Sequence, residues 1–200
     1  MKYAFVVAGV VMALGLGYLV WTKYGSAMLS GNLEPQEVAP TILTYASSTF
    51  SISHPDNFGV DETYAYSQFE GKPILGVKFT VSTVATQGTN LSADSGLSVE
   101  MLPRAIRCTG DIYLPANVKA MSMTMGSTTF SVASSTGAAA GNMYEEQVYA
   151  ISESKPCIAV RYFIHSSNIA NYDPGTVAEF DRAALLSEFD AMRDSLILKQ

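Results

Sequence analysis

Nineteen consecutive residues without a charge lie close to the start of the chain and limit its possible structures more than any other feature. They run from Tyr3 to Trp21 and read "YAFVVAGVVMALGLGYLVW". A helix rises about 1.5 Å per residue, so this stretch nearly matches the roughly 30 Å hydrocarbon core of a bilayer. Tyr3 and Trp21 stand at its ends, where aromatic rings favour the membrane interface. We therefore predict an uncleaved transmembrane anchor over residues 1–24.

A cleavable signal peptide is the alternative, with "GSA" (residues 25–27) as the small-residue cleavage site. The apolar region of such a peptide usually runs about 7–15 residues, and this one is longer. Lys2 and the α-amino group precede the span and Lys23 follows it, which slightly favours a cytoplasmic N-terminus.

One face of the predicted anchor carries Gly9, Ala13 and Gly17 at four-residue spacing. Small residues at this spacing let two membrane helices approach closely, so a homodimer through this face is possible. Glycine and alanine are also common in membrane helices for no such reason.

The rest of the chain divides into a tether and an acidic domain. Residues 25–40, "GSAMLSGNLEPQEVAP", have neither helical nor strand periodicity and read as a flexible tether to a domain over residues 41–200. The whole chain carries a net charge of −6, and without Lys2 and Lys23 the remainder carries −8. No basic stripe interrupts this acidity, so we expect no nucleic-acid partner.

Cys108 and Cys157 are the two cysteines of the chain, and both lie in the predicted domain. A pair of cysteines in an exported domain indicates a disulfide, whereas in the cytosol two buried thiols are more common. Together with the charge bias around the anchor, the pair predicts a single-pass membrane protein with its domain on the extracytoplasmic side, periplasmic or outer.

The domain reads as antiparallel strands followed by one helix. Strands are predicted over 41–45, 49–55, 72–84 with a bulge at Gly76, 97–102, 110–114, 118–125 and 128–133. "MYEEQVYAIS" and "CIAVRYFIHS" resemble a hairpin with its turn at "ESKP" (residues 153–156).

The closing helix is predicted from a capping box formed by Thr176 and Glu179. An apolar stripe follows at three- and four-residue spacing, from Val177 through Phe189 to Leu196. Such a helix should pack across one face of the sheet, so the fold class is α+β.

Two segments resemble the PsbP/Mog1-like domains. "TFSISHPDNF" (residues 49–58) is similar to their opening strand, and "FDAMRDSLIL" (residues 189–198) to their closing helix. The resemblance covers the two ends of the domain and implies a sandwich that serves in binding or assembly. It carries over no catalytic residue.

The loop "TNLSADSGLSVE" (residues 89–100) has nearly the ligand rhythm of an EF-hand calcium site, with oxygen ligands at Asn90, Ser92 and Asp94. Gly96 stands one position late, Glu100 one position early, and the flanking segments are strand-like. We therefore predict a loop that connects strands and binds no calcium.

The same loop suggests a serine hydrolase, because "ADSGL" is similar to the nucleophile motif of trypsin-like proteases. In that alternative the Asp94–Ser95 loop would act with His54. The position before the aspartate is Ala93, which breaks the motif. His54 and His165 are the two histidines, and no His or Cys spacing typical of a metal site accompanies them.

The function expected from these features is a tethered binding or assembly module without catalytic activity, cofactor or metal. The partner would be an envelope protein or a glycan. Binding residues concentrate in loops, so recognition is assigned to two of them, with candidate residues Asn90, Ser92 and Asp94 in the first and Asn168, Asn171 and Tyr172 in the second.

Overall fold

The computed structural model describes residues 40–67, 73–114 and 118–199. Pro40–Gln200 forms a compact unit, and its strands and closing helix supply a complete hydrophobic core. The predicted anchor, its small-residue stripe and the tether up to residue 39 lie outside the described residues. Among the residues that are described, no helix combines the length and hydropathy needed to cross a membrane.

The described chain is mainly strands. They are β1 (Ile42–Ala46), β2 (Phe50–Pro55), β3 (Gly59–Asp61), β4 (Ala65–Tyr66), β5 (Ile74–Thr80), β6 (Gly96–Leu102), β7 (Met121–Met125), β8 (Thr128–Ala139), β9 (Asn142–Ile151), β10 (Cys157–Ser167) and β11 (Ile197–Leu198). The helical segments are α3 (Thr83–Thr86), the 3-10 turns η2 (Gly110–Tyr113) and η3 (Ile169–Asn171), and α4 (Arg182–Asp194).

Two antiparallel sheets form from these strands. The larger sheet has the order β3-β5-β6-β10-β9-β8-β7, with β4 also on β5, and the smaller one has the order β1-β2-β11. The predicted hairpin is confirmed as β9 and β10, and Ala150 lies opposite Ala159 next to the turn. The predicted class, a mostly antiparallel sheet with a C-terminal helix, is confirmed.

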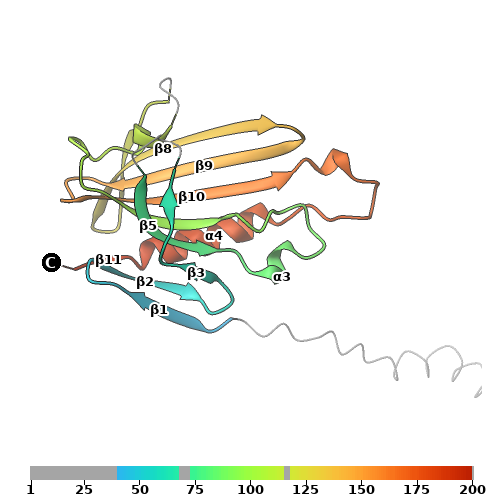
Figure 1. Ribbon diagram of the computed structural model, residues 1–200, viewed down its shortest axis with the longest axis horizontal. Helices are drawn as coiled ribbons and strands as arrows, with labels where there is room; N and C mark the ends of the chain where they lie inside the picture. Colours follow the sequence, from blue (N-terminus) through green and yellow to red (C-terminus); the bar gives the residue numbers. More distant parts are fainter. Residues whose placement is uncertain (1–39, 68–72, 115–117, 200) are drawn as a thin grey trace, which may run out of the picture. The chain divides into compact units, whose positions relative to one another are not determined.

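Helix α4 covers one face of the larger sheet. Side chains of a strand alternate between faces, and in β10 the residues Val160, Tyr162 and Ile164 face the core that contains Leu185 and Phe189 of α4. Figure 1 shows α4 between the larger sheet and the smaller one. Leu185, Phe189 and Met192 of the predicted apolar stripe are therefore confirmed as the buried side of α4, whereas Val177, Phe180 and Leu196 lie outside the helix.

The other face of the larger sheet is half covered. The predicted disulfide is confirmed: Cys108 is bonded to Cys157 at the start of β10. It holds the segment after β6 against this face, where Ala105 and Ile112 pack on a second core cluster around Val148. Among the residues that the structure describes, no such segment lies on the half of the face near the end of β10.

Helix α4 begins later than predicted. Its N-cap is Asp181, whose side chain accepts the Ala184 N–H, and not Thr176. The residues before it bond to the loop after α3: Ala178 N–H donates to the Gly88 carbonyl, and Ala178 O accepts the Asn90 N–H. This extended pairing competes with helix formation, so the predicted capping box is wrong.

Two further local predictions are wrong because of close packing. Residues 110–114 form the 3-10 turn η2 instead of a strand, and Gly110 lies so close to β8 and β9 that a Cβ atom would be 2.7 Å from the Ser131 carbonyl oxygen. Gly76 marks no bulge, since it pairs regularly with Glu100. A Cβ atom there would be 2.5 Å from the Val99 carbonyl oxygen.

Candidate functional site at the end of strand β10

The two loops predicted to carry recognition meet at the C-terminal end of β10. Asn90 O accepts the Ser167 N–H at 2.9 Å. In the second loop, the Asn168 N–H and the Asn171 Nδ2 each donate to the Gly141 carbonyl at 2.8 Å. Loops about eighty residues apart in sequence, together with the β8–β9 turn, therefore surround one end of the larger sheet.

Asn90 fastens this end of the fold. Its side chain donates from Nδ2 to the Ser167 carbonyl at 2.8 Å and accepts the Phe180 N–H at 3.0 Å. Only 6% of the residue is exposed. It is therefore a structural residue and is not available to a ligand.

In the second loop, Asn168 accepts the Ala170 N–H and so caps η3. Asn171 holds the loop to the β8–β9 turn, as described above. Tyr172 is 37% exposed. Of these three predicted residues, Tyr172 is the one with a side chain free to meet a ligand.

Ser95 and His54, the pair of the hydrolase alternative, are not brought together. Ser95 is fully buried, and its Oγ accepts the His165 N–H and donates to the His165 carbonyl, both at 3.0 Å. His54 is buried too, with Nδ1 at 2.8 Å from the Pro55 carbonyl oxygen and its ring against Phe79. The hydroxyl is thus bonded to main chain, with no imidazole partner among the described residues.

The residues of the calcium-like pattern do not converge on one point. Ser92 N–H donates to the His165 carbonyl, the Asp94 carboxylate is paired with a histidine, and Glu100 points to Arg161 in the opposite half of the sheet face. Within the described ranges, no group of three or more His, Cys, Asp or Glu side chains could hold a metal ion.

A group of rings and charges lies on the uncovered half of the sheet face. Asp94 Oδ1 is 2.8 Å from His165 Nδ1, and the His165 ring stacks on Tyr144 with centroids 4.6 Å apart and planes at 20°. Phe163 lies 6.3 Å from both rings, and Lys78 Nζ is 5.5 Å from the Phe163 centroid. We call these five residues the His165 surface.

The electrostatics of the His165 surface follow from its partners. An ionised carboxylate can only accept, so the bond between Asp94 and His165 uses a proton on Nδ1, and Nε2 is the other ring nitrogen. That Nε2 is buried and has no hydrogen-bond partner among the described residues. Burial lowers the pKa of the Lys78 ammonium, and its Nζ donates to the Asp94 carbonyl.

A buried ion cluster supports this surface from the neighbouring part of the same face. Arg161 Nε is 3.0 Å from Glu100 Oε1, and its NH1 is 3.4 Å from Glu146 Oε2. Its NH2 donates to the Tyr64 hydroxyl, and the guanidinium lies 4.1 Å from the centroid of the Tyr66 ring. Two carboxylates and two rings thus enclose one cation.

Burial dominates the titration of this cluster. It raises the pKa of Tyr64 to about 12, although the nearby Arg161 acts in the opposite direction. It also raises the pKa of the Glu146 carboxyl, again against the effect of Arg161. For Arg161 itself burial is the largest single effect and lowers the pKa, but the effects of Glu100, Tyr64 and Glu146 together outweigh it and the net shift is upward.

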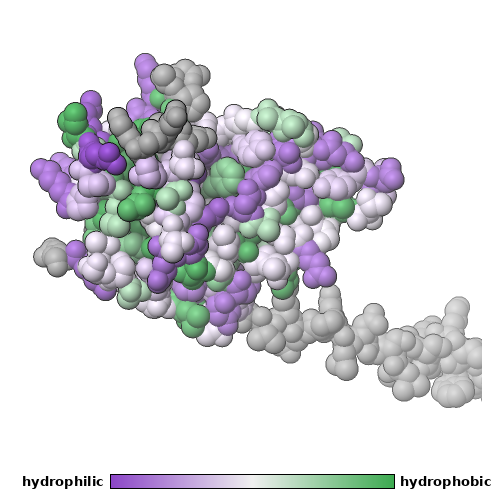
Figure 2. Space-filling view, in the orientation of Figure 1, coloured by the Kyte–Doolittle hydropathy of each residue, from purple (hydrophilic) through white to green (hydrophobic). Residues whose placement is uncertain are grey.

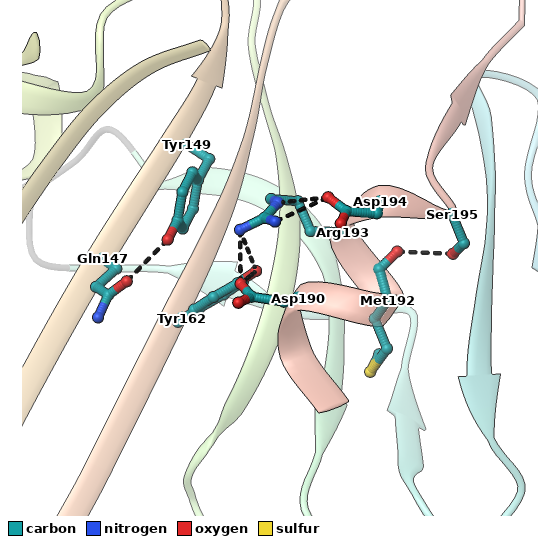
Figure 3. A network of polar contacts seen from close by, with 8 residues as sticks. All are labelled: Gln147, Tyr149, Tyr162, Asp190, Met192, Arg193, Asp194 and Ser195. Carbon is teal, nitrogen blue, oxygen red and sulfur yellow. Dashed lines mark hydrogen bonds and ion pairs between the residues drawn. The ribbon is translucent and has the colours of Figure 1, made fainter. Parts of the chain in front are cut away.

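A second ionic network lies at the end of α4, on the opposite face of the sheet (Figure 3). Arg193 NH1 donates to Asp190 at 2.6 Å and to the Tyr162 hydroxyl at 3.1 Å, while Nε and NH2 donate to Asp194 at 3.0 and 2.8 Å. The guanidinium also lies 4.6 Å from the Tyr149 ring.

This network borders a hollow of about 740 Å³ between the β7–β8 turn and the C-terminal residues. Four of the five N–H groups of Arg193 already have acceptors, so it has little left to offer a ligand there. We therefore interpret the network as a structural contact that holds the end of α4 against the larger sheet. The candidate site is placed at the His165 surface.

Tyr144, Phe163 and His165 were not among the predicted recognition residues. The signal that would have found them is the hairpin register, since a turn at Glu153–Pro156 places Tyr144 opposite His165. Period-two alternation then puts Phe163 on the same face. The contribution of Asp94 depends on a contact across 71 residues, which no local pattern contains.

Comparison with known proteins gives little further information. No protein-family model matches the chain, and no curated protein matches it. The fold is similar to that in a crystal structure from Bacteroides thetaiotaomicron VPI-5482, with a TM-score of 0.43 and 9% identity over 82% of this chain. The chain spans about half of that structure, 50% of its length.

Proposed function

We propose that residues 40–200 form a binding or assembly module without turnover of its own, held outside the membrane by residues 1–24. The disulfide indicates an oxidising compartment. The proposal depends mainly on one observation: no described segment covers half of one face of the larger sheet, and the His165 surface lies there with its rings partly exposed.

The chemistry of the His165 surface favours recognition over catalysis. Tyr144, Phe163 and His165 form a cluster of partly exposed rings, and aromatic rings pack well against flat apolar groups. Asp94, with a side chain 55% exposed, and Lys78 supply an acceptor and a donor at the margin. A glycan, or a protein segment with an aromatic residue, could pack against the rings and form hydrogen bonds with Asp94 and Lys78.

The contacts between the two ends of the domain support a PsbP/Mog1-like relationship, which we propose as the origin of the fold. The Ser195 Oγ after α4 accepts the Ser53 N–H of β2 at 2.8 Å, and β11 pairs with β2. The opening strand and the closing helix, which carry the resemblance, therefore pack as one unit.

The test is binding of residues 40–200 to a glycan array and to envelope extracts, compared between variants. Tyr144→Ala and Asp94→Asn should weaken binding at least about tenfold, as loss of a central contact does. Asp56→Asn changes another exposed carboxylate, directly after β2, and should have no effect. Melting curves must show all three variants folded.

Two results would contradict the proposal. One is binding that is unchanged in both Tyr144→Ala and Asp94→Asn. The other is turnover of a peptide, ester or glycan substrate that disappears in Ser95→Ala, which would indicate the hydrolase instead.

A further inference from the structure

The cations of this acidic domain are distributed unevenly. Three of the described cations are in ion pairs, which join Arg161 to Glu100, Arg182 to Glu145 and Arg193 to Asp190. Arg104, Arg107 and Lys155 are exposed, and no acidic group in the described part of the chain is within ion-pair distance of any of them.

Arg104, Arg107 and Lys155 lie together at one end of the larger sheet. The loop after β6 and the β9–β10 turn border one hollow of about 490 Å³, whose lining includes Arg107, Lys155 and one carboxylate, Glu153. Arg104 belongs to the same loop, and the Cys108–Cys157 disulfide joins loop and turn. We call residues 103–108 together with Lys155 the basic loop.

An apolar group stands at the centre of the basic loop. Ile106, between Arg104 and Arg107 in sequence, is 99% exposed, the highest value among the exposed large hydrophobic residues described. On its other side the loop borders a second hollow of about 380 Å³, lined mainly by apolar residues that include Ile74 and Leu102. Figure 2 shows hydrophobic and hydrophilic side chains interleaved at the end of the molecule where this loop lies.

We propose that the basic loop docks on the surface of a bilayer that contains anionic phospholipids. An apolar side chain flanked by cations suits the headgroup region, where Ile106 would enter the acyl boundary and the cations would meet lipid phosphates. The apolar hollow beside Arg104 offers space for part of one lipid. This inference uses a different surface from the proposed function and does not depend on it.

The opposite charges of the basic loop and of anionic phospholipids favour a bilayer as the partner of this loop. From residue 28 onward the chain carries a net charge of −8, so an anionic bilayer repels most of the domain. In the basic loop, three cations outside the ion pairs described above lie beside the fully exposed Ile106. Docking there would fix which side of the domain faces the membrane.

The experiment is co-sedimentation of residues 40–200, which contain the complete core, with phosphatidylcholine vesicles with and without phosphatidylglycerol. Binding should require phosphatidylglycerol and should fall as salt rises. Arg104→Gln and Arg107→Gln should each lower the partition coefficient about fivefold. Ile106→Ser should lower it about tenfold.

Two control variants distinguish docking through the basic loop from general electrostatic or hydrophobic attraction of the domain to the vesicles. Lys119→Gln removes a cation that is also in no ion pair but does not line the hollows beside the loop. Val84→Ser removes an apolar side chain that is 68% exposed on α3. Both variants should bind as the unchanged domain does, and both should melt at its temperature.

Three results would overturn the proposal. The first is equal binding to vesicles with and without phosphatidylglycerol, or no binding to either. The second is an effect of Lys119→Gln as large as that of Arg107→Gln. The third is loop-dependent capture of a protein by a domain that ignores vesicles, which would assign the loop to a protein partner.

Discussion

At the scale of single residues, Glu100 shows how far tertiary contacts can change the role that a sequence suggests. In the sequence, Glu100 lies one position before that of the calcium-binding glutamate in an EF-hand loop. In the structure it is fully buried in β6, between β5 and β10. Its Oε1 accepts from Ser98 Oγ at 2.7 Å and from Arg161 Nε, while Oε2 has no partner in the described part of the chain. A buried carboxylate of this kind depends on its cation.

Glu100 and Glu146 should therefore respond differently to loss of charge. Glu100→Gln leaves Arg161 buried with one distant carboxylate and should lower the free energy of unfolding by about 3–5 kcal/mol. Glu146→Gln removes the weaker partner at 3.4 Å and should change it by less than about 1 kcal/mol at neutral pH. Denaturant unfolding of both variants measures this, and equal losses would contradict the account.

The pH dependence of Glu146 has a defined sign. Because burial raises its pKa in the folded state, the folded protein holds this proton more tightly than the unfolded chain. The stability contribution is complete below the unfolded pKa and is lost as pH rises through the raised value. The difference in unfolding free energy between Glu146→Gln and the unchanged protein should consequently shrink in acid, and a difference that grows in acid would refute the shift.

At the scale of elements, helix α4 shows a competition between two possible starts. Thr176 and Glu179 have the sequence of a capping box, yet residues 176–180 extend along the loop after α3, and Asn90 bonds the Phe180 N–H. The helix then begins at the next residue able to cap it, Asp181. The capping-box sequence by itself favours a helix that starts at Thr176. The pairing of residues 176–180 with the loop after α3 stabilises the extended conformation instead.

Removal of the true cap should destabilise the domain more than removal of the apparent one. Asp181→Ala loses the bond to the Ala184 N–H and should lower the free energy of unfolding by about 1 kcal/mol. Thr176→Ala loses a hydroxyl bond to the Asp173 carbonyl in an exposed turn and should cost less than half of that. Helix content by circular dichroism and urea unfolding check both, and the reverse order would restore the predicted capping box.

At the scale of the whole molecule, the disulfide lies within the second core cluster. It bridges 49 residues and holds the segment after β6 on the face opposite α4. The main core between α4 and the larger sheet contains neither cysteine. Loss of the bond should therefore lower stability without changing the order of the strands.

Cys108→Ser combined with Cys157→Ser should lower the free energy of unfolding by about 4 kcal/mol, the chain-entropy value for a loop of this length. Reductant should have a similar effect on the unchanged protein and none on the double variant, which serves as its control. A double variant as stable as the oxidised protein would show that the second cluster holds the segment without the bond.

The sequence by itself determined the features that depend on neighbours along the chain. The β9–β10 hairpin, its turn, the strands β1, β2 and β6, and the apolar stripe of α4 all follow from periodicity and turn residues. The cysteine count was sufficient for the disulfide because only one pairing exists within the chain. Nothing in these features required knowledge of the sheet order.

Only the tertiary structure decided which distant residues meet. The order β5-β6-β10-β9 brings Glu100 to Arg161, and the bonds of Asn90 to Ser167 and Phe180 set the end of the sheet and the start of α4. The His165 surface likewise depends on the contact of Asp94 with a strand 71 residues away. Such contacts depend on the order of the strands in the sheet and on which side chains are buried. The spacing of residues along one segment specifies neither.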